Sequence, residues 1–174
     1  MRRILLLGAG LMLSLACGLT PIVTAGAASA APANSTPSTF DLVNYISHDC
    51  LGISDGAAVQ ALCTESADQT WHWGSSYGSS TYQQLVNNNN QCLGIAGSST
   101  AEGADVVAST CNTSRLDQYW WTIYDGNGYS WFVNYNSGLV IGVLAGSTSP
   151  GAAIVQWVWQ DSQNNQLWVP HPIA

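Results

Sequence analysis

Three stretches of the sequence decide the fold: Asp68-Gln69-Thr70-Trp71, Asp117-Gln118-Tyr119-Trp120 and Asn165-Gln166-Leu167-Trp168. Each is a Gln-x-Trp motif preceded by an acidic or amide residue. The successive tryptophans lie 49 and 48 residues apart. A motif that occurs three times at this nearly constant spacing indicates one supersecondary unit repeated three times.

Other short patterns recur in the same order ahead of each motif. Each unit has an apolar-Val-Asn or Leu-Val-Asn step, then a Leu/Ile-Gly-Ile/Val step, then a Gly-Ala pair. The Asn residues are Asn44, Asn87 and Asn134, the central glycines are Gly52, Gly94 and Gly142, and the pairs begin at Gly56, Gly103 and Gly151. The first unit is the shortest, because it lacks five residues between the central glycine and the Gly-Ala pair.

Each unit contains four short apolar or β-branched runs separated by Gly, Asn, Ser or Asp. In the third unit these runs are roughly 130–134, 139–143, 153–159 and 166–169. No stretch shows the 3.6-residue period of a helix, so the pattern predicts an all-β protein with four strands per unit. A single unit of about 45 residues could not bury its own apolar face, so we expect three units to close around a threefold axis.

The cysteines follow the same repeat. Cys50 and Cys63 occupy positions equivalent to Cys92 and Cys111, and in the third unit both positions change together, to Val140 and Trp159. Joint replacement is what a paired contact would show. We therefore predict the disulfides Cys50–Cys63 and Cys92–Cys111, each closing a loop within its unit and each worth about 3 kcal/mol in the chain-entropy model. An apolar contact is expected in their place in the third unit.

The first 30 residues have the pattern of a secretory signal peptide. Arg2 and Arg3 precede an apolar stretch, and Ala28-Ser29-Ala30 is a small-x-small site at which cleavage is predicted after Ala30. A lipoprotein signal through Cys17 is the alternative, but Ser14 stands where that signal needs an aliphatic residue. Residues 31–39 are predicted to be a flexible leader, and 40–174 the folded domain of a secreted, extracellular protein.

The charge of the predicted mature chain limits its partners. It has one arginine, Arg115, no lysine and ten acidic residues, which gives a formal charge of −9. Nucleic acids and anionic membrane surfaces are excluded, because both require clustered basic residues. There is no Cys-x-x-Cys and no closely spaced histidine pair, so neither zinc nor any other cofactor is predicted. Abundant Trp, Tyr, Asn and Gln favour a neutral, polar ligand.

The motifs and their order, over about residues 40–170, resemble the ricin B-chain type of lectin domain, which is similar to family 13 carbohydrate-binding modules. The resemblance implies a β-trefoil of twelve strands with pseudo-threefold symmetry and up to one sugar site per unit. It implies that Trp71, Trp120 and Trp168 fill the shared core. It also implies that the residue before each Gln bonds sugar hydroxyls, which carboxylates and amides suit. The candidate carbohydrate-binding residues are therefore Asp68, Gln69, Asp117, Gln118, Asn165 and Gln166, together with Trp157.

Trp157 stands at the position where the resemblance implies an aromatic platform under the sugar ring. The equivalent positions in the other units hold Ala61 and Ser109. Trp157 and Trp159 are two residues apart on one predicted strand, so their side chains point to the same face. One alternative is that Trp157 simply packs beside Trp159. The other is that Trp157 is the sugar platform and Trp159 fills the core. The third unit is the best candidate for a working site, with Tyr135 and Asn136 on the adjoining loop as possible additions.

One feature departs from the family pattern. Sugar-binding units of ricin-like lectins place an Asp after the Cys-aliphatic pair, whereas this chain has Gly52, Gly94 and Gly142 there. The departure puts galactose binding of the ricin type in doubt. It also favours an alternative function, a β-trefoil protein-interaction or inhibitor module whose sugar sites have degenerated.

An enzyme is not predicted. A glycosidase needs two carboxylates across a cleft, and no acid here departs from the repeat to suggest one. Gly-x-Ser-x-Gly is absent, and the predicted disulfides leave no free cysteine nucleophile. The sequence thus predicts a non-catalytic lectin that binds a neutral glycan or polysaccharide, alone or beside a separately encoded secreted enzyme or protein partner.

Overall fold

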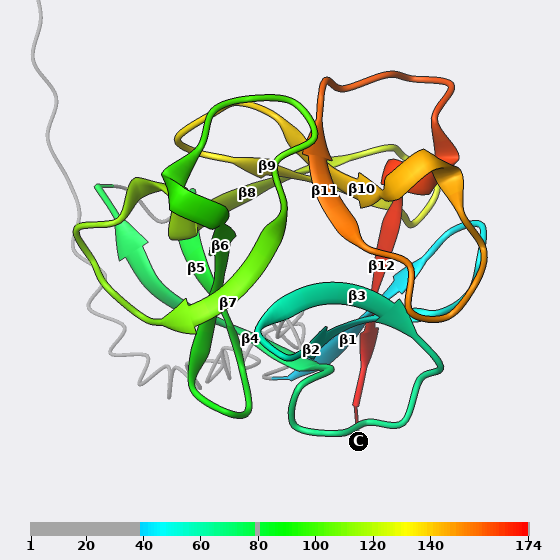
Figure 1. Ribbon diagram of the computed structural model, residues 1–174, viewed down its shortest axis with the longest axis horizontal. Helices are drawn as coiled ribbons and strands as arrows, with labels where there is room; N and C mark the ends of the chain where they lie inside the picture. Colours follow the sequence, from blue (N-terminus) through cyan, green and yellow to red (C-terminus); the bar gives the residue numbers. More distant parts are fainter. Residues whose placement is uncertain (1–38, 79–80, 174) are drawn as a thin grey trace, which may run out of the picture. The chain divides into compact units, whose positions relative to one another are not determined.

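The computed structural model describes residues 39–78 and 81–173 (Figure 1). The predicted signal peptide and nearly all of the predicted leader lie outside these residues. The described chain is built from strands and four three-residue 3₁₀ helices, which confirms the all-β prediction. The strands are β1 (Phe40–Asn44), β2 (Cys50–Ser54), β3 (Ala57–Ala61), β4 (Thr70–Tyr77), β5 (Tyr82–Asn87), β6 (Gln91–Ile95), β7 (Val106–Thr110), β8 (Tyr119–Tyr124), β9 (Ser130–Asn134), β10 (Val140–Val143), β11 (Ile154–Trp157) and β12 (Trp168–Pro172). The 3₁₀ helices are η1 (Ala96–Ser98), η2 (Leu116–Gln118), η3 (Leu144–Gly146) and η4 (Asn164–Gln166).

Six of the strands form a closed ring. Strand β1 pairs with β4, β4 with β5, β5 with β8, β8 with β9, β9 with β12, and β12 returns to β1, all antiparallel. The other six form three hairpins, β2–β3, β6–β7 and β10–β11, which can be followed in Figure 1. The hairpins meet through the pairs Ala57–Val107, Val59–Ala153 and Asp105–Val155. A six-strand ring with three hairpins is the predicted β-trefoil, with units β1–β4, β5–β8 and β9–β12.

The strand bounds of the third unit show where the sequence pattern is reliable. The run predicted at 130–134 is β9 without change, and the run at 139–143 is β10 apart from its first residue. The run at 153–159 is shorter in the structure, because β11 spans Ile154–Trp157 and leaves out the first residue and the last two. The last run begins late, at Trp168, because Gln166 belongs to η4.

The three tryptophans of the Gln-x-Trp motifs fill the common core. Trp71, Trp120 and Trp168 are each 0% exposed. Each indole N–H donates a hydrogen bond to a main-chain carbonyl of its own unit: Leu51 at 3.0 Å, Leu93 at 2.9 Å and Ile141 at 3.3 Å. The polar atom of each buried side chain is thereby satisfied, and the same bond is repeated in all three units.

Both predicted disulfides are present. Cys50 and Cys63 have a Cα–Cα distance of 5.0 Å, and Cys92 and Cys111 one of 4.9 Å. In the third unit, Val140 is buried in an apolar cluster with Trp131. Trp159 packs edge-on against Trp131, with ring centroids 5.4 Å apart, and is 46% exposed. Val140 and Trp159 are thus both associated with Trp131, and the ring contact of Trp159 is with Trp131 rather than with Val140. The idea that Trp159 fills the core is wrong, because the side chain is exposed.

Buried glutamines tie neighbouring hairpins together. Gln60 on β3 donates to the carbonyls of Ser147 and Ser149 in the third unit, each at 2.9 Å. Gln156 on β11 donates in the same way to Ser99 and Ala101 in the second unit, at 3.0 and 2.9 Å. The equivalent position in β7 is an alanine, Ala108. The loop that it would face, between β2 and β3, is the shortened turn of the first unit, and the main-chain N–H of Ala108 donates to the carbonyl of Gly56 in that turn at 3.0 Å.

Candidate functional site

A pocket of about 380 Å³ lies in the third unit, where the sequence placed its best candidate. We call it the third-unit pocket. One side is formed by Gly142 and Val143 at the end of β10 together with η3. The segment between β11 and β12 contributes Gln160, Gln163, Asn165 and Gln166 to the lining. Trp157 and Val155 on β11 complete the lining, which includes no charged residue.

Asn165 is held in place by its neighbours on both sides. Its side-chain Nδ2 donates to the carbonyl of Val143 at 2.8 Å. Its own main-chain carbonyl accepts a hydrogen bond at 3.0 Å from Nδ2 of Asn44, the first unit's copy of the Asn that recurs in all three units. Among the described residues no donor reaches Oδ1 of Asn165, so this half-buried oxygen is available on the pocket wall to accept a hydrogen bond.

The glutamines of the three motifs are occupied by main-chain bonds. Gln166 donates to the carbonyl of Val158 at 2.9 Å and accepts from the N–H of Gln160 at 3.1 Å. Gln69 bonds Leu62 and Thr64 in the same manner. The amide of Gln118 bonds Thr110 and Asn112. All three are buried, so their amides shape the segment ahead of the tryptophan, and only Gln166 lines the third-unit pocket.

Trp157 is the aromatic residue of the third-unit pocket. It is 38% exposed, and its ring lies against Gly103 of the second unit, where an added Cβ would come within 3.2 Å of the indole. Contact with a glycine turn fixes the ring without covering it. Trp159, two residues along the chain, contacts Trp131 instead and does not line the pocket.

The three repeat glycines are explained by close approach. A Cβ at Gly142 would lie 2.9 Å from Cγ of Gln166, one at Gly52 would lie 2.9 Å from Cγ of Gln69, and one at Gly94 would lie 2.8 Å from Oδ2 of Asp117. The space that a side chain would need is taken by the Gln of the motif and the residue before it. The lack of a side chain at each repeat glycine therefore leaves room for the Gln of the motif and the residue before it.

Replacing Gly142 by alanine is expected to lower the free energy of unfolding by about 1–3 kcal/mol, because the new methyl group overlaps a glutamine fixed by two hydrogen bonds. Chemical denaturation measures the loss. In a double-mutant cycle with Gln166→Ala, shortening the glutamine should relieve the overlap, so the two losses should not add. Simple additivity would show that the overlap with Gln166 is not the cause.

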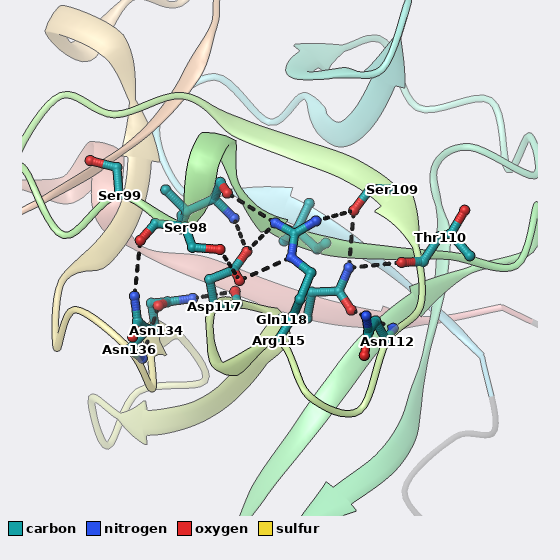
Figure 2. A network of polar contacts seen from close by, with 12 residues as sticks. Ser98, Ser99, Ser109, Thr110, Asn112, Arg115, Asp117, Gln118, Asn134 and Asn136 are labelled. Atoms are coloured by element: carbon teal, nitrogen blue, oxygen red, sulfur yellow. Dashed lines mark hydrogen bonds and ion pairs between the residues drawn. The ribbon is translucent and has the colours of Figure 1, made fainter.

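The second unit has the same scaffold, but an arginine covers its acid. Arg115 donates to both oxygens of Asp117, from Nε to Oδ1 at 3.1 Å and from Nη2 to Oδ2 at 2.6 Å. Ser98 and the N–H of Ile95 donate to the same carboxylate at 2.7 and 3.0 Å. Figure 2 shows Arg115 lying between Asp117 and Ser109, to which Nη1 donates at 3.1 Å. Asp117 is 1% exposed, so its oxygens are already occupied by protein donors.

The electrostatics of Asp117 agree with this geometry. Burial opposes ionisation of the carboxyl, but the hydrogen bonds from Arg115, Ser98 and Ile95 outweigh it, and the pKa of Asp117 is lowered. The carboxylate and guanidinium form a bidentate ion pair, the stronger geometry for such a pair. A surface hollow of about 530 Å³ lies beside this pair, lined by Arg115, Ser109 and 110–113.

The first unit has an acidic residue before its Gln-x-Trp motif, but it lacks the 3₁₀ helix that forms one side of the site in the other two units. Asp68 is half-buried, and its side chain makes no hydrogen bond to another described residue. The wall that η3 provides in the third unit and η1 in the second is absent here, because β2 and β3 are joined by the turn Asp55-Gly56. The five missing residues recognised in the sequence are therefore the residues that would enclose a ligand.

Tyr135 and Asn136, suggested as additions to the third-unit site, lie at the second unit instead. Asn136 donates to the carbonyl of Ser98 at 3.1 Å (Figure 2). Tyr135 packs on Tyr77 and Tyr82, with ring centroids 5.0 and 4.7 Å away. Each strand-end loop reaches the preceding unit, as Asn134 also does by donating to the carbonyl of Asp117 at 2.7 Å. Neither η3 nor Gln163 is predicted from the sequence. The longer β10–β11 loop is a signal for η3, whereas Gln163 lies in the segment between β11 and β12, which that signal does not reach.

No group of three or more His, Cys, Asp or Glu side chains in residues 39–78 and 81–173 is placed to bind a metal ion. Over the same residues, no helix has the length and apolar character needed to cross a bilayer.

Comparison with known proteins places this geometry in a family. The family model described as "Ricin-type beta-trefoil lectin domain-like" matches residues 30–109, 67–157 and 116–174. These overlapping matches are offset by about one unit, as a threefold repeat requires. The chain belongs to this ricin-type β-trefoil lectin family. No curated protein sequence matches it.

Several solved structures share the fold. The designed threefold-symmetric protein ThreeFoil is similar at 26% identity and a TM-score of 0.72, over 78% of this chain and 99% of that one. The exo-β-1,3-galactanase of Clostridium thermocellum matches at 24% identity and 0.71, over 80% of this chain and 31% of the enzyme. The Macrolepiota procera ricin B-like lectin, solved with lactose, matches at 16% identity and 0.67, over 80% and 98%. Such domains thus occur both alone and within enzymes.

Proposed function

We propose that this protein is a secreted, non-catalytic lectin that recognises neutral glycans through the third-unit pocket. One observation supports this most: a half-exposed tryptophan, Trp157, shares an uncharged pocket with the free Oδ1 of Asn165 and the side chain of Gln163. An aromatic face suits the apolar face of a sugar ring, and amides suit its hydroxyl groups. The absence of charge in the lining favours neutral sugars.

Secretion is part of the same proposal. Two disulfides are typical of oxidising compartments. The N-terminal sequence pattern, with Arg2 and Arg3 ahead of an apolar stretch, supports export. The family provides the expectation of glycan binding, and lactose is a suitable first probe because the Macrolepiota procera lectin was solved with it.

The proposed contributions of the seven candidate residues differ. Trp157 would stack on the sugar and Asn165 would accept a hydroxyl hydrogen bond, with Gln166 holding the wall between them. In the first unit, binding by Asp68 and Gln69 would be weak, because no 3₁₀ helix encloses the ligand. In the second unit, Arg115 would have to move before Asp117 and Gln118 could contact a sugar. Of the three repeat positions, we therefore propose that the third unit alone forms a strong site for a neutral glycan.

Replacing Trp157 by alanine is expected to weaken glycan binding on the order of tenfold, because the aromatic platform is lost. The measurement is a glycan array followed by titration calorimetry with the best neutral ligand, beginning with lactose. Trp159→Ala is the matched control, since Trp159 is similarly exposed and two residues away but does not line the pocket.

Equal loss in the two variants would contradict the assignment of the site. Failure of the unmodified protein to bind any glycan would contradict the proposed function, and would leave the protein-interaction module as the better explanation. Partner capture with the purified protein, compared between the unmodified chain and Trp157→Ala, would then be the informative measurement.

A further inference from the structure

A second pocket, of about 390 Å³, lies where the first and third units meet. We call it the junction pocket. Tyr45 follows β1 of the first unit, while Tyr129 and Trp131 belong to the start of the third. Asp161, Asn164 and Leu167 come from the segment between β11 and β12, and Asp125 and Asn127 from the β8–β9 turn. No residue of the junction pocket lines the third-unit pocket.

Aromatic side chains that pack against one another form one wall of the junction pocket. The rings of Tyr45 and Tyr129 meet edge to face, with centroids 4.6 Å apart. A similar pair, Tyr135 and Tyr82, occurs at the junction of the second and third units at 4.7 Å. Tyr45 and Tyr129 line their pocket together with the carboxylates of Asp125 and Asp161. Trp131 is buried in its wall, and the indole N–H has no hydrogen-bond acceptor among the described residues.

The charges of the junction pocket are all negative. Asp125 and Asp161 are its charged residues, and no Arg or His lines it. Desolvation raises the pKa of Asp125, but hydrogen bonds from the main-chain N–H groups of Asn127 and Tyr129 outweigh it, so the pKa is lowered. The carboxyl of Asp161 makes no bond to another described residue. Aromatic faces beside carboxylates attract a cation through both ring quadrupole and charge.

We propose that the junction pocket binds a protonated amine carried by a sugar, that is, a 2-amino-2-deoxy sugar unit of a glycan. The amine would lie by Asp161 and Asp125 against the Tyr45–Tyr129 pair, and Asn127 and Asn164 provide amides for hydroxyl groups. A sugar fits better than a basic protein segment, because the site is a concave pocket that shares the β11–β12 segment with the third-unit pocket. The choice of a sugar rests on the proposed function, while the cation preference rests on the junction pocket alone.

The test compares two probes that differ only in the amine: the β-1,4-linked tetramer of glucosamine and its fully N-acetylated counterpart. Calorimetry with the full protein should show binding of the amine-bearing tetramer that weakens on the order of tenfold in Asp161→Asn and in Tyr45→Ala. Both residues are exposed, so neither change should unfold the chain. Binding should also weaken as salt is raised from about 20 to about 200 mM, because the charges are near the surface. In NMR spectra, the indole N–H signal of Trp131 should shift with the amine-bearing probe.

The two proposals fail in different ways. If the acetylated tetramer binds the junction pocket equally well, if Asp161→Asn has no effect, or if a lysine-rich peptide displaces the amine-bearing tetramer at lower concentration, the junction proposal is overturned. Trp157→Ala should leave junction binding unchanged. If Trp157→Ala has no effect on any neutral glycan while Trp131 still responds to the amine-bearing tetramer, the third-unit site is overturned and the junction pocket is not.

Discussion

Replacing Trp120 by alanine is expected to lower the free energy of unfolding by about 3–5 kcal/mol, because the side chain is wholly buried and leaves a cavity that the ring of strands cannot close. A second loss adds to the cavity: the carbonyl of Leu93 loses the indole N–H that satisfies it at 2.9 Å. A domain of this size has about 5–15 kcal/mol of stability in total, so the variant should be close to unfolding at room temperature. Denaturant titration followed by circular dichroism measures the change.

Two variants separate the causes. Trp120→Phe keeps most of the packing and removes only the N–H donor, so its loss should be clearly smaller than that of alanine. Trp159→Ala removes a tryptophan that is 46% exposed, and should cost about 1 kcal/mol or less. Equal losses at positions 120 and 159 would show that the Gln-x-Trp tryptophans do not form the core on which the trefoil depends.

The fold could be predicted because the positions that recur in all three units indicate which side chains are buried. A position that is Trp in all three units, 49 and 48 residues apart, is expected to be buried in a shared core, and Trp71, Trp120 and Trp168 all belong to one buried apolar cluster. The disulfides followed from the same alignment. The loops were less predictable, because they contact other units: Asn136 bonds Ser98 in the second unit, a contact that no spacing within the third unit reveals.

The site could be predicted only in part, and for a physical reason. Trp157 and Asn165 occupy repeat positions, so their pairing in one pocket could be anticipated. Arg115 occupies a position that is Gln163 in the third unit and Ser66 in the first, so it belongs to no repeated pattern. Its position two residues before Asp117, as the only cation of the predicted mature chain, was the one available signal for the ion pair. The close contacts of Gly142 with Gln166 depend on ångström-scale distances that the sequence does not contain.

Arg115→Gln is expected to destabilise the protein by about 3 kcal/mol at neutral pH, because it leaves the buried carboxylate of Asp117 without its counter-charge. The hydrogen bonds from Ser98 and Ile95 remain, but they compensate only part of the cost of burying the charge. The double variant Arg115→Gln with Asp117→Asn should recover most of the loss. It reproduces the Gln163–Asn165 pair of the third unit, in which a neutral amide occupies the same place on the same scaffold.

The pH dependence distinguishes this cause from a mere loss of packing. In the unmodified protein the pKa of Asp117 lies below its ordinary value of 3.8, so its contribution to stability is present above that pH and is lost as pH falls through the lowered pKa. Without Arg115, burial dominates and the pKa of Asp117 rises. Acidification then protonates Asp117 and removes the unpaired buried charge that destabilises the variant. The difference in the free energy of unfolding between Arg115→Gln and the unmodified protein should therefore become smaller as the pH falls through the range in which Asp117 is protonated. Denaturation curves at several pH values measure this difference. A constant deficit would show that the arginine stabilises through its aliphatic stem, and that Asp117 tolerates burial without it.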